Sequence, residues 1–125
     1  MKVVADRMFD GVDILDLKGS IEIYDGSSSL RDVVVGLLTS GRRCLILNLH
    51  DVTYVDGKGL GTMFHCQMKA RHCGGELFLL AVTRQLDAQI RDSGYPSWAE
   101  SFTIFNTEEE ALHALGPTPP LPPAA

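Results

Sequence analysis

Residues 44–61 read Cys-Leu-Ile-Leu-Asn-Leu-His-Asp-Val-Thr-Tyr-Val-Asp-Gly-Lys-Gly-Leu-Gly. The first six residues form a short apolar run, which is typical of a strand covered by helices on both faces. The residues from Asp51 to Asp56 predict a loop after that strand, and a helix is expected to begin near Lys58. Asp56 suits the N-cap of this helix, and the glycines allow a tight turn. In open α/β sheets, functional loops lie at this edge.

The segments on either side of this stretch alternate between strand and helix patterns. Further strands are expected at residues 3–9, 12–17, 21–24, 77–82 and 102–105, and further helices at about 28–40, 84–92 and 107–115. An Asp-Gly turn at residues 10–11 makes the first two strands antiparallel. The order predicts one α/β domain, residues 1–116, with a mixed β-sheet and about four α-helices packed on it. Residues 117–125, mostly proline and alanine, predict an extended, flexible Pro-rich tail.

Composition excludes several classes of function. The net charge of −5 and the absence of any Lys/Arg cluster larger than Arg42-Arg43 argue against nucleic-acid binding. No apolar run approaches the ~20 residues that span a bilayer, so direct membrane insertion is not expected. The first ten residues lack the apolar segment of a signal peptide, and three cysteines fit a reduced compartment. We therefore expect a cytoplasmic protein, whose oligomeric state the sequence does not indicate.

Metal and catalytic sites are not expected. The pairs His65-Cys66 and His72-Cys73 recur seven residues apart, so two helical turns, ~10.5 Å, separate them. This distance is too large for one zinc ion or for a disulfide within the helix. Ser93 precedes a glycine but lacks the surrounding G-x-S-x-G elbow of a nucleophile. The sequence thus predicts neither an enzyme nor a cofactor.

The stretch from Asp51 to Gly61 resembles a family signature. It reads Asp-Val-Thr-Tyr-Val-Asp followed by Gly-Lys-Gly-Leu-Gly. It is similar to D-(apolar)-x-(aromatic)-(apolar)-D-S-(S/T)-G-L-G of the bacterial anti-sigma-factor antagonists, the STAS family. Shorter resemblances follow in the family's order at residues 19–22, 74–77, 93–94 and 107–112. The resemblance covers nearly the whole chain. It implies a STAS-like α/β domain that binds a partner protein and catalyses nothing.

In this family, a serine or threonine two residues after the aspartate is phosphorylated by a partner kinase, and the added charge prevents docking. Lys58 occupies that position, so the resemblance implies that this control is lost. The implied partner is an anti-sigma factor or a related kinase-fold regulator, whose sequestration frees a sigma factor. By analogy with the family, the loop at residues 25–29 is expected to flank the partner-binding surface. The residues expected to bind the partner are Glu22, Asp56, Gly57, Lys58, Gly59, Leu60, Gly61 and Thr62.

Other interpretations of this stretch remain open. Asp56 and the glycines fit an ordinary strand-to-helix turn. A lysine at a helix start is mildly disfavoured by the helix dipole, so Lys58 is either simply solvated or part of a weak anion site for a partner's carboxylate or phosphate. The chain is also compatible with a STAS-type adaptor or scaffold in a signalling or transporter complex, or with a small-molecule or anion sensor.

Overall fold

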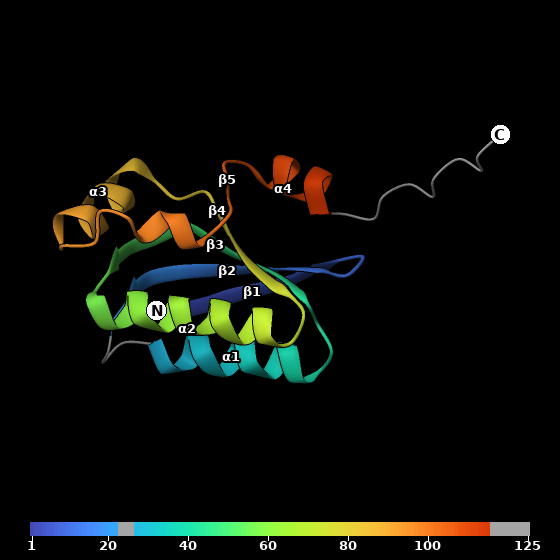
Figure 1. Cartoon of the computed structure of the whole chain (residues 1–125). Helices are drawn as coiled ribbons and strands as arrows, with labels where there is room; N and C mark the ends of the chain where they lie inside the picture. The colour runs from blue at the N-terminus through green and yellow to red at the C-terminus, as the bar shows by residue number, and fades with distance from the viewer. Residues whose placement is uncertain (23–26, 116–125) are drawn as a thin grey trace.

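The computed structural model describes residues 1–22 and 27–115 (Figure 1). The elements are β1 Lys2–Phe9, β2 Val12–Ile21, α1 Ser27–Thr39, β3 Cys44–Val55, α2 Gly57–His72, β4 Glu76–Leu80, α3 Arg84–Asp92, the 3₁₀ helix η1 Trp98–Ser101, β5 Ile104–Phe105 and α4 Glu108–Leu115. Their strands form one sheet in the order β1-β2-β3-β4-β5, with β1 antiparallel to β2 and the other neighbours parallel. The predicted α/β class, with a mixed sheet and four α-helices in the described part of the chain, is confirmed. The expected tail, the expected strand continuation at residues 23–24 and residues 25–26 of the expected flanking loop lie outside that part.

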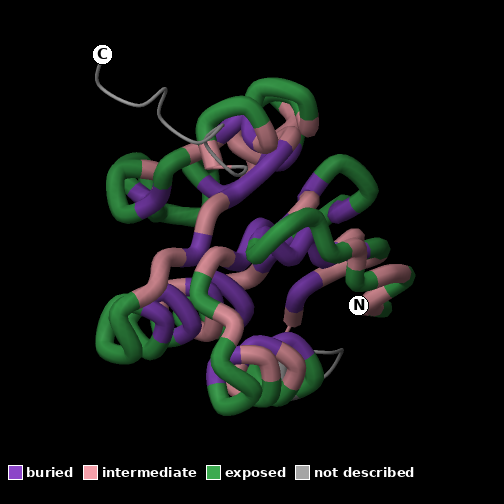
Figure 2. Tube along the Cα trace, turned by 90° about the vertical axis from the view of Figure 1, so that its right-hand side faces the viewer, coloured by how far each residue is buried: buried purple, intermediate pink, exposed green. Residues whose placement is uncertain are grey.

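Two separate apolar cores hold the helices on opposite faces of the sheet. On one face, inward leucines such as Leu15, Leu47 and Leu79 pack under α1 and α2, which lie side by side (Figure 1). The other face buries Ile46 and Phe105 in a smaller core that α4 covers. Figure 2 shows this arrangement as buried stripes along helices whose remaining surface is exposed. Such one-sided burial is what the 3.6-residue apolar pattern predicts.

Glycines in the left-handed conformation follow both α1 and α2. Gly41 has φ of +93°, and the bonds Gly41 N–H to Leu38 O (3.1 Å) and Arg42 N–H to Leu37 O (3.0 Å) end α1 in a Schellman motif. Gly74, with φ of +83°, follows α2 in the same left-handed conformation. A side chain at either position would strain the backbone.

The prediction of a loop after Leu49 is wrong, because β3 continues to Val55. Its second half pairs with β2 alone, since pairing with β4 ends at Asn48. Two register shifts place extra residues in β3, and these bulges let Val52 and Val55 both point into the core. They also destroy the strict alternation that marks a strand in a sequence. The bulged extension carries the chain past the end of β4 before α2 begins.

Two smaller details depart from the sequence pattern. Met68 is 69% exposed, although its spacing from Leu60 and Phe64 would place it on the apolar face of α2, whereas Cys66 and Gln67 are buried there. The Gln67 side-chain amide bonds to both the N–H and the carbonyl of Leu77, so a polar residue fastens α2 to β4. The last strand, expected at residues 102–105, is only Ile104–Phe105, and Phe102 instead closes η1 by donating its N–H to Ala99 O at 3.1 Å.

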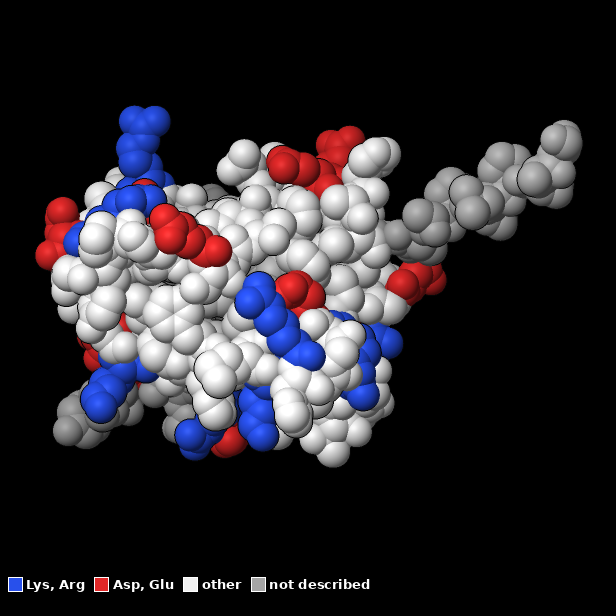
Figure 3. Space-filling view, in the orientation of Figure 1, with Lys and Arg blue, Asp and Glu red and all other residues white. Residues whose placement is uncertain are grey.

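Charge is distributed unevenly over the surface. Acidic side chains lie over α4, whose first turn holds three glutamates, and basic side chains lie over α2, whose last turn is basic (Figure 3). Glutamates at a helix start and cations in the last turn of α2 both suit the helix dipole. Among residues 1–22 and 27–115, no helix has the length and apolar character needed to cross a membrane.

Candidate functional site

The first turn of α2 is held by Asp56. Its side chain accepts a hydrogen bond from Gly59 N–H at 2.6 Å, and its carbonyl accepts one from Leu60 N–H at 2.8 Å. Asp56 has an extended backbone (φ −86°, ψ 176°), as an N-cap residue should. The carboxylate thus satisfies one amide that the helix leaves unpaired. The predicted N-cap is confirmed.

Close backbone packing joins this turn to the end of β2. Asp56 N–H donates to Ile21 O at 3.2 Å. A Cβ built on Gly59 would collide with that same carbonyl group, so this position has room only for glycine. The packing brings Glu22 beside the start of α2, where its carboxylate accepts a bond from the Ser20 hydroxyl at 3.2 Å.

The residues expected to bind a partner differ in exposure. Gly57, Lys58 and Gly61 are exposed, and Glu22, Asp56 and Thr62 are half-buried. Gly59 and Leu60 are buried, so their contribution to this surface is to hold the turn in place. The Thr62 hydroxyl donates to Lys58 O at 3.1 Å. The fold therefore brings the predicted residues of β2 and α2 to one edge, with Lys58 on its outside.

A glutamine from α3 fixes the end of β3. Gln89 Oε1 accepts from Val55 N–H and Gln89 Nε2 donates to Val55 O, both at 2.9 Å. Val55 has no neighbour on the β4 side, because β4 stops pairing at Asn48. The Gln89 amide therefore replaces the missing strand and satisfies both backbone groups just before Asp56.

We expect Gln89→Leu to destabilise the domain by about 1–3 kcal/mol, because both bonds to Val55 are lost while the site stays partly buried. Denaturant unfolding measures this free energy, and amide hydrogen exchange at Val55 should quicken. Gln85→Leu is the control, since Gln85 lies exposed on the same helix. An equal effect from both variants would show that Gln89 does not hold β3.

Tyr95, in the turn between α3 and η1, lies against Gly57. Its hydroxyl is 2.5 Å from the Cβ that any other residue at position 57 would carry, and its nearest ring carbon is 3.4 Å away. The tyrosine is 42% exposed, so one side covers Gly57 and the other faces solvent. The sequence singled out neither Tyr95 nor Gln89, because the contacts join segments more than thirty residues apart.

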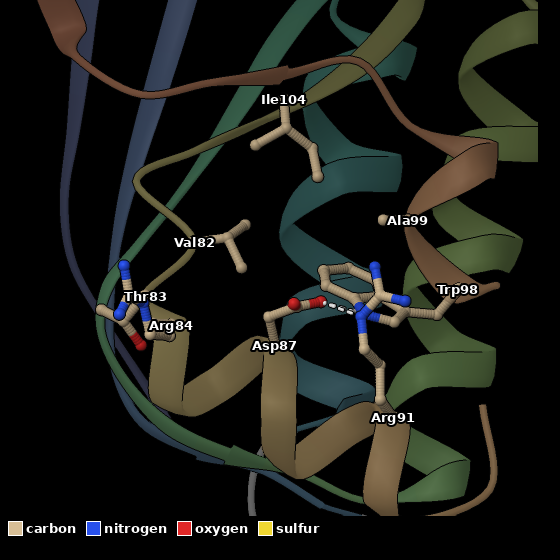
Figure 4. A pocket seen from close by; sticks show the side chains of 8 residues that line it. All are labelled: Val82, Thr83, Arg84, Asp87, Arg91, Trp98, Ala99 and Ile104. Carbon is tan, nitrogen blue, oxygen red and sulfur yellow. Dashed lines mark hydrogen bonds and ion pairs between the residues drawn. The ribbon is translucent and has the colours of Figure 1, made fainter. Parts of the chain in front are cut away.

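A network on α3 fixes the turn that carries Tyr95. Asp87 Oδ1 accepts bonds from Trp98 Nε1 at 3.0 Å and from Arg91 Nε at 2.9 Å (Figure 4). Arg91 Nη1 also donates to Pro96 O at 2.7 Å, and Trp98 is buried. Val82 and Ile104 line the adjoining cavity of about 400 Å³. Trp98 is thus a packing residue.

The cysteine and histidine residues of α2 do not form a site. Within the described residues, no group of three or more His, Cys, Asp or Glu side chains is arranged to hold a metal ion. Cys66 is buried and Cys73 exposed. Burial raises the pKa of the Cys66 thiol to about 12, so the reactive thiolate is essentially absent at neutral pH.

Comparison with known families identifies the fold. A family model described as the STAS domain matches residues 6–111. The chain belongs to the STAS domain family. The match begins within β1, covers the rest of the sheet, α1 to α3 and the start of α4, and includes the whole of the Asp56 turn.

Solved structures share the STAS fold at low sequence identity. A putative anti-sigma factor antagonist from Thermotoga maritima is 20% identical, with a TM-score of 0.75 over 88% of this chain and 92% of that chain. The Bacillus cell fate determinant SpoIIAA in its phosphorylated form is 19% identical, with a TM-score of 0.63 over 88% and 96%. The murine Solute Carrier 26 family member A9 anion transporter is 19% identical, with a TM-score of 0.71 over 86% of this chain but only 18% of that chain.

Proposed function

We propose that this STAS domain is a non-enzymatic, cytoplasmic anti-sigma-factor antagonist of a bacterium, which docks on a kinase-fold anti-sigma factor through the start of α2. The observation that carries the proposal is the capped first turn, which presents Gly57 and Lys58 to solvent beside Glu22. The likeness in fold to a putative anti-sigma factor antagonist over 88% of this chain supports it.

The proposal includes the loss of phosphorylation control at position 58. Lys58 offers an ammonium group where the family signature has a hydroxyl, so no phosphoryl group can be accepted there by the usual chemistry. Related SpoIIAA has been solved in a phosphorylated form. In this chain the nearest helix hydroxyl, Thr62, lies one turn further on and donates to the Lys58 carbonyl. Without phosphorylation at this position, the domain is permanently active, permanently inactive, or controlled by its supply.

Charge reversal at Lys58 tests the docking surface. We expect Lys58→Asp to weaken binding at least tenfold, because it places at this position the negative charge that phosphate would bring, whereas Lys58→Ser keeps binding within about threefold. A pull-down from the native organism identifies the partner, and titration of the purified partner gives its affinity. Lys69→Asp, in the exposed last turn of the same helix, is the control.

The outcomes separate the candidate functions. Recovery of a kinase-fold anti-sigma factor that Lys58→Asp no longer binds supports the proposal. Recovery of a transporter or sensory complex instead would replace it with the adaptor role. The observation that favours the adaptor role is the similarity in fold between this domain and part of an anion transporter. Equal binding by Lys58→Asp and Lys69→Asp would contradict docking at the start of α2.

A further inference from the structure

Position 57 departs from the family signature together with position 58. The signature has serine immediately before the phosphoacceptor, and this chain has Gly57. The space of that missing side chain is filled by the Tyr95 hydroxyl, 2.5 Å from where the Cβ would lie. Gly57 and Tyr95 therefore depend on each other: any side chain larger than hydrogen at position 57 must displace the tyrosine.

Tyr95 lies in a turn whose backbone is held by hydrogen bonds. The Trp98 amide donates to Tyr95 O at 3.3 Å, and Arg91 holds the next residue, Pro96, by its carbonyl. Gly94, with φ of +104°, sets the turn. A tyrosine on a fixed backbone loses little backbone freedom on binding, and tyrosine is frequent among the residues that dominate interfaces.

Lys58 adds an exposed positive charge to the surface beside Glu22 and Asp56. No acidic side chain of residues 1–22 or 27–115 forms an ion pair with its ammonium group. The positive end of the α2 dipole disfavours a cation at this position. An acidic group from outside the chain would pair with the ammonium group and offset its unfavourable interaction with the dipole. An adjacent aromatic ring favours a protein surface over a free small anion.

We propose that Tyr95 is a specificity-determining residue of the docking surface, which recognises an acidic segment of the partner protein together with Lys58. This inference rests on the proposed function and extends its surface from α2 to the turn between α3 and η1. The Tyr95 hydroxyl occupies the space that the serine side chain of the family signature would fill at position 57. A partner that docks here therefore contacts Tyr95 where it would otherwise contact that serine.

A double-mutant cycle tests the inference by titration against a purified kinase-fold anti-sigma factor of the same organism. Tyr95→Ala is expected to weaken binding about tenfold or more. Gly57→Ser should weaken it similarly in the native chain, because the serine displaces Tyr95, but should have no further effect in the Tyr95→Ala chain. Met68→Ala, exposed on α2 far from its start, is the control, and thermal unfolding verifies that every variant is folded.

The results distinguish this inference from the proposed function. If Lys58→Asp abolishes binding while Tyr95→Ala binds like the native chain, the docking surface stands and the role of Tyr95 is contradicted. Additive losses from Gly57→Ser and Tyr95→Ala would also contradict it, because the two residues would then act separately. If neither Lys58→Asp nor Tyr95→Ala changes binding, the result contradicts the proposed docking surface itself, on which this inference rests.

Discussion

We expect Gly59→Ala to destabilise the domain by about 3 kcal/mol, at the upper end of the usual cost of overpacking. The added Cβ would overlap the carbonyl oxygen and carbon of Ile21, and a backbone group cannot move aside by changing rotamer. The same carbonyl accepts the Asp56 N–H, so relief of the overlap would break that bond and pull α2 away from β2. Partner binding should fall with stability, because the docking surface spans both elements.

Gly61→Ala is the matched control for this variant. Gly61 lies in the same helix two residues later, and a Cβ there would have no neighbour within 4 Å. Alanine at that position is expected to stabilise the domain by up to about 1 kcal/mol, as in any exposed helix interior. Urea unfolding of both variants measures the difference. Equal stability of the two alanine variants would contradict the close contact between α2 and β2.

The second large effect is expected at the opposite end of the sheet. Asp13 on β2 has no exposed surface, and its Oδ1 accepts bonds from Nε and Nη2 of Arg42 in the connection between α1 and β3. Oδ2 has no partner among the described residues. Arg42→Met should therefore lower the denaturant midpoint markedly, because it leaves a buried carboxylate without its cation.

A second substitution separates charge from packing. Asp13→Val combined with Arg42→Met should recover much of the lost stability, since replacing both members of a buried ion pair by apolar residues is often neutral. Arg43→Met is the control, because Arg43 is exposed and its guanidinium bonds only to backbone carbonyls. Denaturant midpoints of the four proteins, native chain included, measure these effects. Failure of the double variant to improve on Arg42→Met would show that the site needs the arginine for another reason.

The parts of the fold that local patterns determine were predictable from the sequence. The one-sided apolar pattern of α1 and the N-cap of α2 depend on residues within a few positions of one another, and both were confirmed. The end of β3 was not predictable, because its bulges are defined by pairing with β2. An isolated strand pattern cannot reveal a register shift in its neighbour.

The candidate site shows the same division between local and distant contacts. Asp56, Gly57 and Lys58 stand out in the sequence because they are adjacent and match a family signature. Gln89 and Tyr95 carry no local signal, since their roles come from contacts to Val55 and Gly57 across the fold. The alternation of strands and helices predicts that α3 packs on the sheet, but not which of its polar residues reaches the backbone of β3.

Lys58 is the residue on which the regulatory account depends. The most direct test titrates the native chain and Lys58→Ser against the purified kinase-fold anti-sigma factor, each before and after incubation with that kinase and Mg-ATP. We expect the native chain to bind with the same affinity in both states and to incorporate no phosphate, whereas Lys58→Ser becomes phosphorylated and loses binding. A native chain that does not bind, or that acquires phosphate and is then released, would contradict the account.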